Sequence, residues 1–67
     1  MRQATFAAVP VGAVFWWGGF TLDRCNWGRK RSSRTADYRP RLSGKLTDWQ
    51  EWGYWRSDET VFWEPEA

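Results

Sequence analysis

The side chains of this chain that are best suited to chemistry are arginines and aromatic rings, and both are concentrated in particular regions. Eight of the ten basic residues lie between Arg24 and Lys45, whereas six of the eight acidic residues lie from Asp48 onward. Seven Trp, four Phe and two Tyr occur in only 67 residues. Single-strand and RNA-binding domains use this combination, because guanidinium groups contact phosphates while rings stack on bases. The basic middle of the chain therefore predicts an acidic partner.

The candidate residues for binding nucleic acid, or another acidic partner, are the basic side chains of the central stretch and two aromatic residues that border it. They are Arg29, Lys30, Arg31, Arg34, Arg39, Arg41, Trp27 and Tyr38. An acidic protein surface would also suit these side chains. A simpler interpretation places Trp27 at the edge of the core and leaves the arginines as solubilising groups.

A second candidate surface is the aromatic cluster between Trp49 and Trp55. Trp, Tyr and Arg dominate the hot spots of protein interfaces, and the acids around this cluster would repel nucleic acid. Alternation along a strand puts Trp49 and Trp55 on one face and the intervening aromatics on the other. We expect Trp52 and Tyr54 to pack inward. The candidate protein-interface residues are then Trp49, Trp55 and Arg56.

The residue inventory argues against an enzyme. The chain has no histidine, which removes the commonest general base and excludes a zinc site built from Cys and His. It also lacks a glycine-rich phosphate loop and a nucleophile elbow. Cys25 lies beside Arg24, which favours a reactive thiolate, but a small buried thiol is the preferred interpretation. We predict no catalytic residue, no metal site and no cofactor.

The size of the chain allows one small domain with a marginal core. A single cysteine cannot form an internal disulfide, so aromatic side chains must supply the buried area. A lone thiol without an export signal indicates the cytoplasm. Residues 3–22 are uncharged and long enough to span a bilayer. Their glycines, threonines and proline make a transmembrane helix a minor alternative.

Strand signals dominate the elements that must position these residues. Residues 1–12 form a lead-in segment in which Phe6 and Val9 plug one end of a barrel, and a first strand covers residues 13–17. Gly18 and Gly19 predict a hairpin turn, with a return strand starting at residues 20–22. The alternation of residues 29–36 predicts a further strand, with Lys30, Ser32, Arg34 and Ala36 on one face.

The C-terminal half is expected to contain a flexible loop near residues 37–46, because Pro40, Ser43 and Gly44 favour turns. A strand is predicted at residues 52–56, followed by a turn at 57–59 and a closing strand at 60–63, which Pro65 ends. A short helix capped by Thr47 or Asp48 remains the alternative before residue 53.

Several of these residues fall into a pattern that resembles a set of small β-barrel proteins, many of them encoded by bacteriophages and prophages. The matching residues are Phe6, Val9-Pro-Val-Gly12, Phe15, Lys30-x-Ser32-x-Arg34-Thr-Ala36 and Val61. They follow F-x-x-L/V-x-x-G-x-x-F and K-x-S-x-x-T-A. In this set an aromatic residue stands two places before the lysine. Here that place is Gly28, with Trp27 one place early, and a longer segment holding Cys25 precedes it. The resemblance implies a compact barrel and no established activity.

The prediction is therefore a mainly β single domain over residues 1–67, either SH3-like or a five-to-six-stranded antiparallel barrel. The expected function is that of a non-enzymatic interaction module, of phage type by the resemblance, which would place it in the cytoplasm of the host cell. Its partner would be nucleic acid or a host protein that handles nucleic acid. The alternative is a protein-binding inhibitor of host-takeover or anti-defence type, or a virion assembly component, that uses the C-terminal tryptophan cluster. A membrane-anchored protein is the least favoured option, and self-association is left open.

Overall fold

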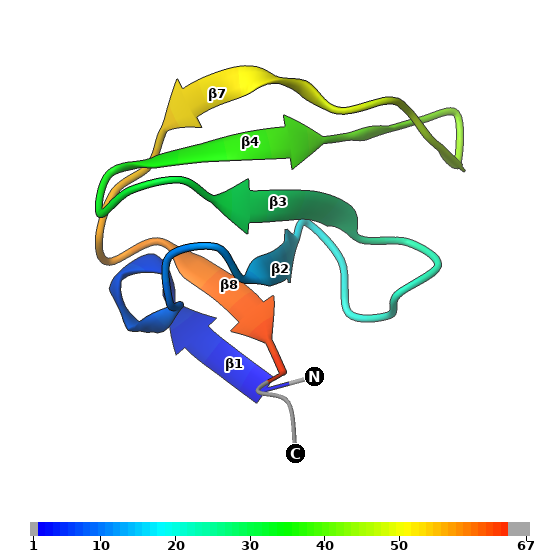
Figure 1. The fold of residues 1–67 in the computed structure, drawn as a ribbon. Helices are drawn as coiled ribbons and strands as arrows, with labels where there is room; N and C mark the ends of the chain where they lie inside the picture. Colours follow the sequence, from blue (N-terminus) through cyan, green and yellow to red (C-terminus); the bar gives the residue numbers. More distant parts are fainter. Residues whose placement is uncertain (1, 65–67) are drawn as a thin grey trace.

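The computed structural model describes residues 2–64 and contains β-strands and one short 3₁₀ helix (Figure 1). Six strands form one antiparallel sheet in the order β1-β8-β2-β3-β4-β7. They are β1 (Arg2–Thr5), β2 (Val14–Trp17), β3 (Asn26–Lys30), β4 (Thr35–Arg39), β7 (Gln50–Tyr54) and β8 (Thr60–Trp63). β5 (Arg41–Leu42) and β6 (Lys45–Leu46) form a separate two-stranded ribbon, and η1 (Phe6–Ala8) is the 3₁₀ helix. The predicted mainly β, antiparallel fold is confirmed.

The sheet is twisted but does not close into a barrel. β1 and β7 are its two edges, and within residues 2–64 they do not pair with each other (Figure 1). η1 instead forms hydrogen bonds with the segment that precedes β8. The Phe6 N–H donates to the Glu59 carbonyl at 2.9 Å, and the Ala7 N–H donates to the Ser57 carbonyl at 3.0 Å. The strand number agrees with the prediction, and the barrel closure does not.

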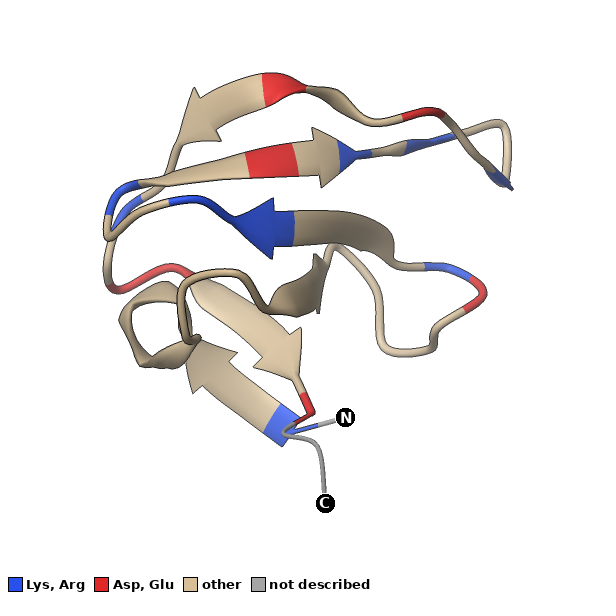
Figure 2. Cartoon of the chain, in the orientation of Figure 1, with Lys and Arg blue, Asp and Glu red and all other residues tan. Residues whose placement is uncertain are grey.

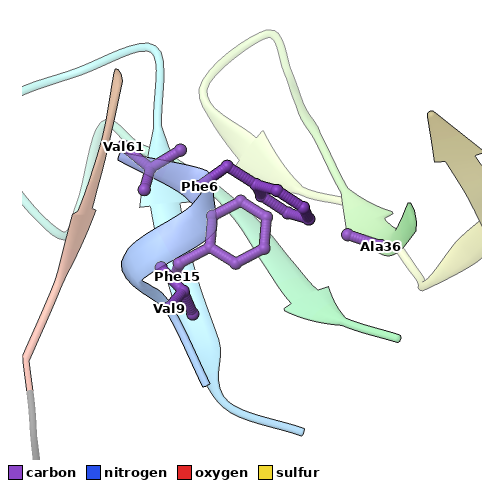
Figure 3. Packing of buried hydrophobic residues seen from close by; sticks show 5 residues of the cluster. All are labelled: Phe6, Val9, Phe15, Ala36 and Val61. Atoms are coloured by element: carbon purple, nitrogen blue, oxygen red, sulfur yellow. The ribbon is translucent and has the colours of Figure 1, made fainter. Parts of the chain in front are cut away.

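The core lies between one face of the sheet and η1. Its buried residues are Phe6, Val9, Phe15, Ala36 and Val61 (Figure 3). The Phe6 ring meets Phe15 edge to face at a centroid distance of 5.5 Å and stacks on Trp55 at 5.6 Å. Large rings bury much area per residue, so this small chain fills an interior without a disulfide. The predicted burial of Phe6 and Val9 is confirmed.

Gly28 occupies a place in the core sheet that no larger residue fits. A Cβ atom there would lie 2.4 Å from Cζ of Phe15, which stands opposite Gly28 in the β2–β3 register. The Phe15 ring therefore packs directly against the β3 backbone. This explains why an aromatic residue is absent two places before Lys30.

Lys30, predicted as a binding residue, is buried and joins η1 to the sheet, so its ammonium group does not face a partner. Only 4% of its surface is exposed, and Nζ donates to the Phe6 carbonyl at 2.8 Å and the Val9 carbonyl at 2.7 Å. Nζ also lies 4.6 Å from the Phe6 ring centroid. Gly12, at φ +93°, donates its N–H to the Lys30 carbonyl at 2.8 Å. The glycine and lysine of the motif thus have a structural role.

The basic stretch over residues 29–36 forms a hairpin rather than one strand. β3 ends at Lys30 and β4 begins at Thr35. In the turn, the Arg31 N–H donates to the Thr35 carbonyl at 2.9 Å, and the hydroxyls of Ser32 and Thr35 lie 2.6 Å apart. The side chains of Ser32 and Thr35 hydrogen-bond to each other within the turn, and such local bonds favour a turn over a continuous strand.

Some of the other predicted element boundaries agree with the structure and others do not. The strands predicted at 13–17 and 60–63 are present as β2 and β8, and residues 57–58 form a turn. The return strand at 20–22 is wrong, because Trp17 pairs with Asn26 and residues 18–25 form a loop. The segment 37–46, expected as a loop, contains the end of β4 together with β5 and β6. β7 begins two residues before the predicted strand, and Pro65 lies outside the described residues.

The uncharged segment 3–22 forms most of β1, then η1 and β2, rather than a transmembrane helix. Across residues 2–64, no helix has the length and apolar composition needed to cross a bilayer.

Candidate functional site

The face of the sheet opposite the core carries a second set of aromatic rings together with arginines. Successive side chains of a strand point to opposite faces, so the neighbours of buried Phe15, Gly28 and Ala36 face away from the core. This outer face extends from β2 to β7. Its members are Trp16, Trp27, Arg29, Asp37, Arg39, Trp52 and Tyr54.

Three of the four aromatic residues between Trp49 and Trp55 are oriented the opposite way to the prediction, and Trp49 is the exception. Trp52 and Tyr54 face outward, with 44% and 80% of their surfaces exposed. Trp55 packs against the core, and its N–H donates to the Arg34 carbonyl at 2.8 Å. Gly53 pairs with buried Ala36, which turns both neighbours of Gly53 to the outer face. A shift of one residue in strand register exchanges the two faces of a strand. The prediction for residues 52–55 used the wrong register.

Arginines and aromatic rings of this face contact each other. Cζ of Arg29 lies 4.6 Å from the Trp49 ring centroid, and Cζ of Arg31 lies 5.8 Å from that of Trp52. Trp52 meets Tyr54 edge to face at 5.2 Å. These distances are typical of cation–π and aromatic pairs. We call the group Arg29, Arg31, Asp37, Trp49, Trp52 and Tyr54 the aromatic–arginine face.

The charge of this region is greatest at one end of the β3–β4 hairpin. Figure 2 shows basic segments at the tip of β3 and along the turn that follows, with an acidic segment in the middle of β4. That acidic residue is Asp37, which stands opposite Arg29 and forms a 3.6 Å ion pair with Arg31. Arg34 lies exposed in the turn. Two guanidinium groups, of Arg29 and Arg31, therefore contact rings of this face, and a third, of Arg34, belongs to the turn that follows β3.

Arg41, also predicted as a binding residue, holds a loop outside the aromatic–arginine face. Its Nε donates to the Cys25 carbonyl at 2.9 Å, and its Nη2 donates to the Leu22 carbonyl at 2.8 Å. Its backbone N–H donates to Oδ1 of Asn26 at 2.8 Å. These bonds hold the loop of residues 18–25 against the β5–β6 ribbon.

The remaining predicted residues are dispersed. Tyr38 lies on the same face of β4 as buried Ala36, and Nε of Arg39 donates to the Thr47 carbonyl at 2.6 Å. Arg56 forms a bidentate pair with Asp58 at 2.9 and 3.0 Å, outside the sheet. Of the predicted set, Arg29, Arg31 and Trp49 come together on the aromatic–arginine face.

Sequence reasoning missed Asp37, Trp52 and Tyr54 as members of the site. A usable signal was present, because counting outward from the buried Ala36 of the K-x-S-x-x-T-A motif places Asp37 on the outer face. The exposure of Trp52 and Tyr54 depends on pairing between β4 and β7, which has an irregular register between Ala36 and Tyr38. That pairing has no signature in the local sequence.

Cys25 is buried, and its Sγ donates to the Gly19 carbonyl at 3.3 Å. Burial raises the pKa of this thiol above its ordinary value, which disfavours a thiolate. The structure therefore agrees with a structural thiol.

Two hollows among the described residues lie at the β1–β8–β2 end of the sheet, away from β7. The larger, of about 440 Å³, is bordered by Val14, Trp16 and Trp63, and the smaller, of about 300 Å³, by Phe20 and Phe62. Neither lining contains Lys or Arg. The aromatic–arginine face, which contains arginines, is therefore the better candidate for binding an acidic ligand.

No protein-family model, curated protein or solved structure matches this chain. The resemblance to small phage proteins stays an expectation from short motifs. Several of those motif residues, including Phe6, Gly12 and Lys30, are occupied with holding the fold together.

Proposed function

We propose that this protein is a non-enzymatic module that binds single-stranded nucleic acid through the aromatic–arginine face. The observation that carries the proposal is the exposed Trp52–Tyr54 pair beside the guanidinium group of Arg31. Exposed rings give bases a stacking surface, and nearby arginines give the backbone its phosphate contacts.

A single strand suits this surface better than a duplex. The rings lie on a sheet face rather than on a helix that could enter a major groove. Bases in a duplex are stacked on one another and hide their faces, whereas unpaired bases can lie on Trp and Tyr rings. Tyr54 is the most accessible of these rings in the aromatic–arginine face, so it is assigned the first stacking position.

The electrostatic contribution is expected to be moderate. The whole chain has a net charge of +2, and Asp37 lies among the arginines of the face. The ion pair between Arg31 and Asp37 is partly exposed, so it is weak and can open when a phosphate competes for the guanidinium. Stacking therefore carries a large share of the affinity.

The test is a titration of a short single-stranded oligonucleotide followed by tryptophan fluorescence at several salt concentrations. Tyr54→Ala should weaken binding roughly 5- to 150-fold, the value of one stacked base. Arg31→Ala combined with Arg34→Ala should flatten the log–log salt slope by about one to two units, since each phosphate contact contributes about −0.7.

Arg56→Ala is the matched control, because Arg56 is exposed but lies outside the face and pairs with Asp58. It should leave the affinity and the salt slope nearly unchanged. A binding constant indifferent to salt, or equal losses in all variants, would contradict the proposal.

A second candidate function is protein binding by strand addition. β7 is an edge of the sheet, and Trp52 and Tyr54 project from this strand. Edge strands with adjacent aromatic anchors can receive an extended segment of a partner. A host protein captured equally well before and after nuclease treatment, and lost with Tyr54→Ala, would favour this function over nucleic-acid binding.

A further inference from the structure

Asp37 is an acidic residue in the middle of a face otherwise suited to phosphates and bases. It is on the β4 strand, directly opposite Arg29 in the β3–β4 register. It also faces the part of β7 that carries Trp52, because Ala36 pairs with Gly53 while Tyr38 pairs with Gln50. A carboxylate here repels a phosphate backbone. Its presence on a nucleic-acid-binding face is therefore explained only if it contacts another part of the ligand.

The carboxylate is accessible and its ion pair is loose. The side chain of Asp37 is 30% exposed, and its Oδ1 lies 3.6 Å from Nη1 of Arg31. That distance exceeds the range of a hydrogen bond. The pair can therefore exchange partners: Arg31 turns to a phosphate while Asp37 accepts hydrogen bonds from another donor.

We propose that Asp37 makes the aromatic–arginine face select guanine within a bound single strand, an inference that rests on the proposed function. Unpaired bases expose their Watson–Crick edges to protein side chains. Guanine presents two adjacent donors there, N1–H and the N2 amino group, which match the two oxygens of one carboxylate. Adenine and cytosine offer an amino donor beside a ring acceptor, and thymine offers one N–H between two carbonyls.

The neighbours of Asp37 fit this role. Trp52 and Asp37 share Arg31 as a contact, since the guanidinium lies over the ring at 5.8 Å and within 3.6 Å of the carboxylate. A guanine stacked on one ring of the Trp52–Tyr54 pair could thus turn its Watson–Crick edge toward Asp37. The released guanidinium of Arg31 would contact the phosphate of the same nucleotide.

The experiment compares three short oligothymidine strands of equal length: one unmodified, one with a single central guanine, and one with inosine at that place. Inosine lacks the N2 amino group and keeps N1–H. The wild-type protein should bind the guanine strand roughly 5- to 100-fold more tightly than the unmodified strand, the value of a bidentate pair. Inosine should lose most of that advantage.

Asp37→Asn should abolish the preference for guanine over inosine while binding the unmodified strand at least as well as the wild type, because a repulsive charge is gone. Glu51→Gln is the control, since Glu51 is an exposed acid of β7 and its change removes the same charge. It should retain the guanine preference.

Equal binding of the guanine, inosine and unmodified strands by the wild type would overturn the role of Asp37 and leave the proposed function intact. A guanine preference that persists in Asp37→Asn would overturn it as well. If no strand binds, the proposed function itself fails, and the selection by Asp37 fails with it.

Discussion

Lys30 shows at the scale of one residue how a member of a basic sequence run can belong to the interior. Its ammonium group donates to three carbonyls of the segment around η1, while the basic residues on either side of it stay exposed. Burial lowers the pKa of this group, because the charged form loses hydration. The carbonyl hydrogen bonds offset that loss, so the lysine ties the lead-in segment to the sheet.

Replacing Lys30→Met should destabilise the protein by about 2–4 kcal/mol, because methionine keeps an apolar stem but leaves buried carbonyls without a donor. Urea unfolding followed by tryptophan fluorescence measures the change. Arg34→Met is the control, since Arg34 lies exposed in the β3–β4 turn. If both substitutions lower the free energy of unfolding equally, the buried hydrogen bonds of Lys30 do not stabilise the fold.

At the scale of elements, the loop of residues 18–25 is held by a side chain distant in the sequence. Within the loop, the Thr21 carbonyl accepts from the N–H groups of Arg24 and Cys25 at 3.1 and 2.9 Å. Arg41 adds bonds to the carbonyls of Leu22 and Cys25 from outside it. The planar guanidinium can reach several carbonyls at once, which a lysine ammonium cannot do with the same geometry.

Arg41→Lys should therefore loosen this loop without unfolding the sheet. Amide hydrogen exchange at Arg24 and Cys25, read by NMR, should accelerate roughly 5- to 30-fold, as expected for the loss of about 1–2 kcal/mol of local protection. Exchange in β3 and β4 should change little. Faster exchange spread evenly over all strands would instead indicate a global loss of stability.

At the scale of the whole molecule, the seven tryptophans divide between the two faces of one sheet. Trp17, Trp55 and Trp63 pack against the core, whereas Trp16 and Trp27 meet edge to face at 5.9 Å on the outer face. Trp49 and Trp52 are the rings contacted by arginines. The stability of the fold and the proposed binding face thus depend on different tryptophans.

Trp55→Ala should cost roughly 3–5 kcal/mol and unfold much of the protein, because truncating a large core ring leaves a cavity in a marginally stable domain. Trp52→Ala should cost only about 1 kcal/mol, since that ring is half exposed. Thermal unfolding followed by circular dichroism compares the two. The opposite ranking would restore the inward orientation of Trp52 that the sequence pattern suggested.

Features determined by local sequence were predicted well. β-branched and aromatic residues with flanking turn signals located β2 and β8 and indicated a mainly β chain. Phe6 and Val9 of the lead-in segment were expected to plug one end of the fold, and both are buried. Each of these inferences depends on a residue and its near neighbours in the sequence.

What only the tertiary structure decided is which face each residue occupies. The pairing of Gly53 with Ala36 turned Trp52 outward and allowed Trp55 to stack on Phe6. The approach of η1 gave Lys30 its buried acceptors. Strand register has a period of two residues, so one long-range pair reverses a whole strand, and no local pattern of alternating aromatic residues can choose between the two solutions.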